Sequence, residues 1–97
     1  MFLEIVTPEA ILFSSEVDSF SVPGINGEFQ MLNNHATVVS ILREGNVKVH
    51  VHSQEHLEMD TISGHLKTHI DDDKILTLAI TSGTLELNEN KAIILAD

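Results

Sequence analysis

The residues of this chain best suited to chemistry are two histidines that flank a valine. His50 and His52 are two positions apart, so a strand would place both imidazoles on one face, and Glu58 follows shortly after. Imidazole nitrogens and carboxylate oxygens are common ligands of zinc and other transition metals. Lys48 would share the same face, however, and its positive charge opposes the binding of a divalent cation. We therefore expect a solvated strand face here and predict no metal ligand.

The spacing around these histidines faintly resembles the first metal-binding motif of the cupins. That motif would run from Gly45 through His50, His52 and Glu58 to Gly64. Each spacing differs from the cupin pattern by one residue, and no second motif with a further histidine follows at the required distance. A cupin-like metal site at His50 and His52 stays an alternative hypothesis, which metal analysis of the purified protein would test.

The other polar clusters do not predict a catalytic centre. His65 and His69 lie four apart without an obvious third ligand, and the run 71–73 lacks the spaced oxygens and distant glutamate of a calcium loop. Neither a Gly-x-Ser-x-Gly elbow nor a Gly-x4-Gly-Lys-Ser phosphate loop occurs. We predict no catalytic residue and no bound cofactor.

Composition excludes several classes of partner. The 97 residues carry 5 Lys and Arg against 15 Asp and Glu, a formal charge of −10. Nucleic-acid binding depends on cations that neutralise phosphates, so we expect no nucleic-acid partner. No apolar run approaches the roughly 20 residues of a membrane helix, which predicts no direct membrane insertion. The length predicts one domain over residues 1–97, and the absence of Cys excludes disulfides.

The dominant hydrophobic period is two, which predicts strands. Apolar residues alternate with polar ones at 47–52 and 57–60, and β-favouring runs occupy 75–80 and 92–95. The stretch 34–42 could be helical, but its β-branched content favours a strand. Short turn signals separate these runs, at 23–27, 43–46, 63–64, 71–73, 82–83 and 88–90. The pattern predicts an all-β fold, a β-sandwich of two sheets and about ten strands without a substantial helix.

Five ordered segments together resemble the epsilon subunit of F-type ATP synthases. The family pattern contains Gly-x-x-Gly-Glu, His-Ala-Pro, Leu-x-x-Gly, Ser-Gly-Gly-x-x-Glu-Val and a last strand ending in Leu-Ala-Asp. The matching segments span nearly the whole chain in the right order: Val17–Phe29, Leu32–Thr37, Leu42–Val47, Thr81–Leu87 and Lys91–Asp97. Each segment alone is a weak signal, and their order makes the set specific.

The resemblance implies a ten-stranded sandwich with no chemistry of its own. In the family this domain turns with the central stalk, binds the gamma subunit and the polar loops of the c-ring, and passes proton-driven rotation to ATP synthesis. It implies a peripheral position on the cytoplasmic face of the bacterial inner membrane. By resemblance, the c-ring contact falls on Ile25, Asn26, Gly27 and Glu28, and the gamma contact falls on His35, Ala36, Thr37 and Leu42.

Three departures from the family pattern affect what the resemblance implies. Thr37 replaces the usual Pro, which restores a backbone N–H donor. The segment 53–74 is longer than usual and suggests an enlarged or extra hairpin. The sequence ends at Asp97, so the ATP binding and inhibition associated with two C-terminal helices are not carried over. A free-standing β-sandwich that binds a ligand is the other alternative, although the chain lacks the Trp and Tyr that sugar-binding sites usually present.

Overall fold

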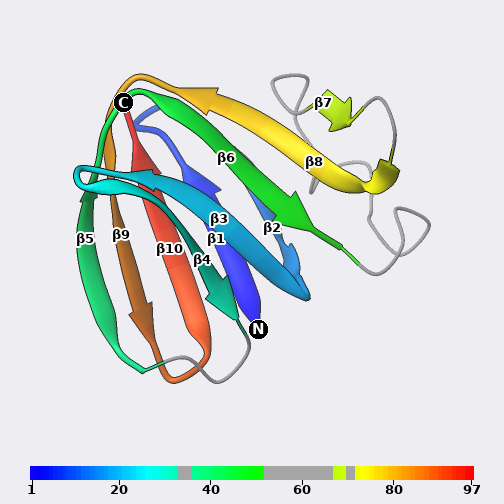
Figure 1. Ribbon diagram of the computed structural model, residues 1–97, viewed down its shortest axis with the longest axis horizontal. Helices are drawn as coiled ribbons and strands as arrows, with labels where there is room; N and C mark the ends of the chain where they lie inside the picture. Colours follow the sequence, from blue (N-terminus) through cyan, green and yellow to red (C-terminus); the bar gives the residue numbers. More distant parts are fainter. Residues whose placement is uncertain (33–35, 52–66, 70–71) are drawn as a thin grey trace.

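The computed structural model describes residues 1–32, 36–51, 67–69 and 72–97, and these residues form ten strands and no helix (Figure 1). The predicted all-β fold is confirmed. The strands are β1 (Phe2–Val6), β2 (Ile11–Glu16), β3 (Ser19–Gly24), β4 (Gly27–Leu32), β5 (Val38–Leu42), β6 (Gly45–His50), β7 (Lys67–His69), β8 (Asp72–Ile80), β9 (Gly83–Asn88) and β10 (Lys91–Ala96).

Alternation of apolar and polar residues explains why these segments are strands. In β6, Val47 and Val49 are buried while Lys48 and His50 lie half-buried on the opposite face. Successive side chains of a strand point to opposite faces, so this pattern covers the core on one side and meets water on the other. The second alternating run predicted from the sequence, 57–60, lies outside the described residues.

The observed strand bounds test two expectations from the sequence. The stretch 34–42 contains strand β5 rather than a helix, as its β-branched residues favoured. The acidic run 71–73, expected to be a turn, is instead partly strand, because β8 begins at Asp72 and Asp72 pairs with His69 of β7. Pairing with a neighbouring strand outweighs the weak β propensity of aspartate at this position.

The strands form one hydrogen-bonded path that folds over into two facing layers. The order is β2-β1-β10-β9-β5-β3-β6-β8-β7, and β4 pairs with β3. The path changes layer between β5 and β3, which pair only through Leu42 and Gly24. Strands β1 and β10 are parallel, although they stand at opposite ends of the sequence. The predicted sandwich is therefore continuous along one side.

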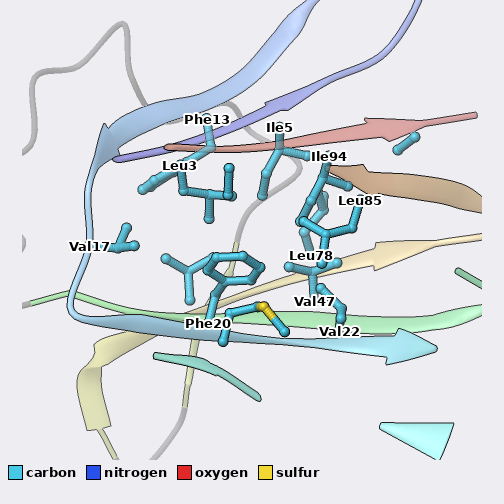
Figure 2. Packing of buried hydrophobic residues seen from close by; sticks show 14 of the residues in the cluster. Leu3, Ile5, Phe13, Val17, Phe20, Val22, Val47, Leu78, Leu85 and Ile94 are labelled. Atoms are coloured by element: carbon cyan, nitrogen blue, oxygen red, sulfur yellow. The ribbon is translucent and has the colours of Figure 1, made fainter. Parts of the chain in front are cut away.

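The core fills the space between the two layers (Figure 2). Phe13 and Leu3 point inward from the layer of β1 and β2, and Phe20 and Val47 face them from the layer of β3 and β6. Each large apolar side chain buried in this way contributes about 1.5–3 kcal/mol relative to exposure. Buried residues from both layers make up this core, so it holds the two layers together.

Candidate interaction surfaces

The tight turn between β3 and β4 projects from one end of the sandwich (Figure 1). Gly24 pairs with Gly27, and only Ile25 and Asn26 lie between them, both exposed. Gly27 has φ of 128°, a conformation that residues with a Cβ rarely adopt. The turn places the four residues of the predicted c-ring contact together at its tip: Ile25, Asn26, Gly27 and Glu28.

Glu28 is the charged group of this turn. Its side chain is 55% exposed, and one carboxylate oxygen lies 3.8 Å from Lys48 Nζ. Both groups remain open to water, so the pair contributes little to stability and leaves the carboxylate available to a partner. The turn can therefore present one carboxylate and one exposed isoleucine to a facing loop.

Two backbone hydrogen bonds join the turn to β5. The N–H of Ile25 donates to the carbonyl of Ile41 at 3.3 Å, and the N–H of Arg43 donates to the carbonyl of Pro23 at 2.8 Å. These bonds fix the turn beside the end of β5. The predicted c-ring contact and part of the predicted gamma contact are thus adjacent in the fold.

The four residues predicted to contact gamma occupy different environments. His35 lies outside the described residues. Ala36 and Thr37 are exposed just before β5, and the Thr37 hydroxyl donates to Asn88 Oδ1 at 3.4 Å. Leu42 is only 2% exposed and belongs to the core, so in this fold it supports β5 from beneath and does not reach the surface. The most exposed side chains of β5 are Val39 and Ile41, which are 76% and 61% exposed.

Four apolar residues and Thr84, one from each of five strands, form a row across the outer face of one layer. Ile41 pairs with Thr84, Thr84 with Leu95, Leu95 with Val6, and Val6 with Ile11. Ile41, Leu95 and Ile11 are among the most exposed large hydrophobic residues, and Val6 is half-buried. Single exposed apolar residues are ordinary, whereas several neighbouring ones on one face are a common feature of surfaces that bind another molecule. We call these five residues the apolar row.

The apolar row could not be predicted from the sequence. Its members come from segments as distant as positions 6 and 95, and no spacing along the chain links them. A partial signal was present in β5, where alternation would assign Val39 and Ile41 to one face and Leu42 to the other.

The histidine hypothesis has limited support from the described residues. His50 is half-buried on the outer face of β6, and Lys48 shares that face, as predicted. His52 and Glu58, the other members of the cupin-like pattern, lie outside the described residues. Within the ranges that the structure describes, no three His, Cys, Asp or Glu side chains gather in a way that could hold a metal ion.

Within the part of the chain that the structure describes, no helix has the length and apolar character needed to cross a bilayer.

The fold and the exposed surfaces define a small β-sandwich that presents an apolar face and a projecting acidic turn. Residues 1–67 match the family model of the ATP synthase delta/epsilon chain β-sandwich domain. The chain belongs to this family, as the sequence resemblance predicted.

Curated relatives of this chain are named as one particular subunit. The ATP synthase epsilon chain of Campylobacter jejuni is 41% identical over 76 residues, which cover 78% of this chain and 57% of the relative. The epsilon chain of Chlorobaculum tepidum is 34% identical over 95 residues and covers 98% of this chain and 86% of the relative. The chain thus spans a little over half the length of the Campylobacter relatives that it matches.

Solved structures share the fold at low sequence identity. A chain from the central stalk and c-ring of the Tetrahymena thermophila mitochondrial ATP synthase superposes with a TM-score of 0.71 at 15% identity, covering 99% of this chain and 62% of that one. A chain from the Euglena gracilis mitochondrial ATP synthase gives 0.69 at 18% identity and covers 97% and 48%. The sandwich architecture is therefore common to this chain and to those two structures.

Proposed function

We propose that residues 1–97 act as a non-catalytic domain of the central rotor of an F-type ATP synthase. In this role the domain binds the gamma subunit on one surface and the polar loops of the c-ring on another, and it helps to couple proton-driven rotation to ATP synthesis. The observation that carries the proposal is the pair of adjacent surfaces, the projecting turn and the apolar row, on a chain of the epsilon family. The proposed location is peripheral, on the cytoplasmic face of the bacterial inner membrane.

The gamma contact is proposed for the exposed side of β5 and the residues just before it. Val39 and Ile41 offer apolar area, while Ala36 and Thr37 extend this surface before the start of β5 with a methyl group and a hydroxyl group. An apolar centre with a polar rim is the usual composition of a stable protein interface. His35 remains part of this proposal because it precedes the described part of the surface.

The c-ring contact is proposed for the turn of Ile25, Asn26, Gly27 and Glu28. A short rigid turn presents its carboxylate with little loss of conformational freedom on binding. The chain's charge of −10 favours partner loops that carry cationic groups and accelerates their encounter at low salt.

Two binding measurements test this function with one matched pair of variants. The chain is immobilised and exposed to the purified gamma subunit of the same organism, and then to detergent-solubilised c-ring with gamma present. Glu28→Gln should leave gamma binding unchanged and should weaken c-ring capture. Glu89→Gln removes the same charge from the β9–β10 hairpin at the opposite end of the sandwich, and it should change neither (Figure 1).

The results separate the two contacts. Absence of gamma binding at micromolar concentrations would refute the rotor function. Equal c-ring capture by both variants would show that the turn is not the c-ring contact. Stoichiometric metal in the purified protein, lost in His50→Ala, would instead support the cupin-like alternative.

A further inference from the structure

Strand β5 has an open edge. It pairs with β9 along all five of its residues, but on its other side it pairs with β3 only at Leu42. Figure 1 shows β5 at the margin of its layer, with the β3–β4 turn beside its end. Among the described residues, no strand lies along the rest of this edge.

The backbone groups on the open edge follow from the hydrogen bonds at its end. The backbone carbonyl of Ile41 accepts a hydrogen bond from the N–H of Ile25, so the backbone groups of Ile41 point away from β9. Successive residues of a strand direct their N–H and C=O groups to alternate edges. Val39 therefore directs both of its backbone groups to the open edge, whereas Ser40 and Leu42 direct theirs to β9.

A slot lies next to this edge, lined by the turn residues 24–28, by Phe29 of β4 and by residues 39–41 of β5. Phe29 borders it and packs against the core but is only partly buried, and Val39 and Ile41 are exposed on the outer face. An added strand would complete the burial of Phe29 and cover part of Val39 and Ile41.

We propose that this slot is filled by strand addition: an extended segment of the gamma subunit pairs with β5 and extends the layer. The inference rests on the proposed function, because it states how gamma is bound. Main-chain hydrogen bonds would supply part of the affinity, and alternate side chains of the segment would meet Val39 and Ile41 on the outer face. Soluble proteins usually protect an open edge with Pro or Lys, and β5 contains neither.

Charge decides which kind of segment fits. Glu86 is the cross-strand neighbour of Val39 on the outer face, where alternate side chains of the added segment would lie. The added segment should therefore carry Lys or Arg among its apolar residues. Pairing of two copies of this chain through β5 is disfavoured, because each copy has a formal charge of −10 and would bring the same acids together.

Val39→Pro tests the proposal because it removes the N–H that faces the open edge. That N–H takes no part in pairing with β9, and proline is tolerated in edge strands at such positions. The dissociation constant for purified gamma should rise at least about tenfold, since one hydrogen bond is lost and a partner carbonyl is left unpaired. Val39→Thr keeps the N–H and the β-branched shape, so its affinity should stay within about threefold of the original.

Amide hydrogen exchange on the unmodified chain gives an independent test that needs no variant to fold. In the free chain the amides of Ser40 and Leu42 should be protected and those of Val39 and Ile41 should exchange quickly. Addition of gamma should protect Val39 and Ile41. This period-two change is specific to strand pairing, because a partner that merely covers the outer face would not select alternate amides.

The outcomes distinguish this inference from the function on which it rests. If gamma binds the original chain and Val39→Pro equally, with the Val39 amide still exchanging quickly, strand addition is wrong while the rotor function stands. If gamma does not bind the original chain, both are wrong. If the chain alone forms a dimer that Val39→Pro dissociates, the occupant of the slot is a second copy and not gamma.

Discussion

Neighbouring residues at the end of β5 offer a test that separates stability from binding. Leu42 faces the core with 2% exposure, and Ile41 faces solvent with 61% exposure. Truncation of either residue to Ala removes three side-chain carbons. The two variants should nevertheless differ in what they impair, stability in one and binding in the other, because the lost carbons come from opposite faces of one strand.

Leu42→Ala should reduce the stability of the free domain. Removal of a fully buried leucine side chain costs about 2–5 kcal/mol, which combines the lost burial with the cavity left behind. For a domain of this size, each kcal/mol shifts the melting temperature by about 4–8 °C. A loss of about 3 kcal/mol should therefore lower the melting temperature by about 10–25 °C. Gamma affinity, measured at a temperature where the variant is still folded, should change by less than about threefold.

Ile41→Ala should reduce binding while leaving the free domain nearly as stable. An exposed substitution away from special backbone features changes stability by no more than about 0.5 kcal/mol. Three carbons at about 0.8 kcal/mol each, scaled by the 61% exposure that a partner could remove, give about 1.5 kcal/mol. That free energy corresponds to an approximately tenfold larger dissociation constant for gamma.

Thermal unfolding followed by circular dichroism, together with isothermal titration against purified gamma, measures both quantities on the same samples. The assignment of the two faces would be refuted by an unchanged melting temperature in Leu42→Ala. It would also be refuted by a drop of 10 °C or more, about the size expected for a core truncation, in Ile41→Ala. Unchanged gamma affinity in Ile41→Ala would exclude the outer face of β5 from the interface.

Three further substitutions test individual features of the fold. Gly27→Ala should lower the free energy of unfolding in urea by about 1–3 kcal/mol. The cause would be backbone strain alone, because φ is 128° and an added Cβ would meet no atom within 4 Å. An unchanged urea midpoint would contradict the left-handed turn. Gly83→Ala should lower the urea midpoint through a steric clash, because the added Cβ would lie 2.6 Å from the Leu95 carbonyl oxygen. A variant as stable as the original would show that β9 and β10 are not so close. Lys48→Ala should change the free energy of unfolding by less than about 1 kcal/mol, since its ion pair with Glu28 is open to water, and a larger loss would mean that the pair is structural.

The sequence by itself determined the local structure of most of the described chain. Alternation at 47–51 predicted a strand with three valines inward, and the structure buries all three. The turn signal at 88–90 was also reliable: Glu89 and Asn90 adopt φ of 51° and 62° in a two-residue hairpin loop that suits asparagine. These features depend on neighbouring residues alone, so the sequence contains the information that they require.

The sequence indicated only in part where the residues of the predicted contact sites lie in the fold. The turn residues from Ile25 to Glu28 lie together because they are consecutive and a tight hairpin holds them. Leu42 was assigned to the gamma surface by its position in a motif, but its side chain belongs to the core. Strand geometry places Val39 and Ile41 on the face opposite Leu42, and the packing of β5 onto the core selects which of the two faces is buried.

Only the tertiary structure decided which strands became neighbours, and with that the surfaces themselves. Val6 and Leu95 stand side by side because β1 and β10 pair in parallel, and this pairing brings the row from Ile41 to Ile11 into register. The open edge of β5 likewise exists because β3 leaves it after a single pair. Contacts between distant segments are selected by the closure of one common core, and a local pattern of residues does not specify that closure.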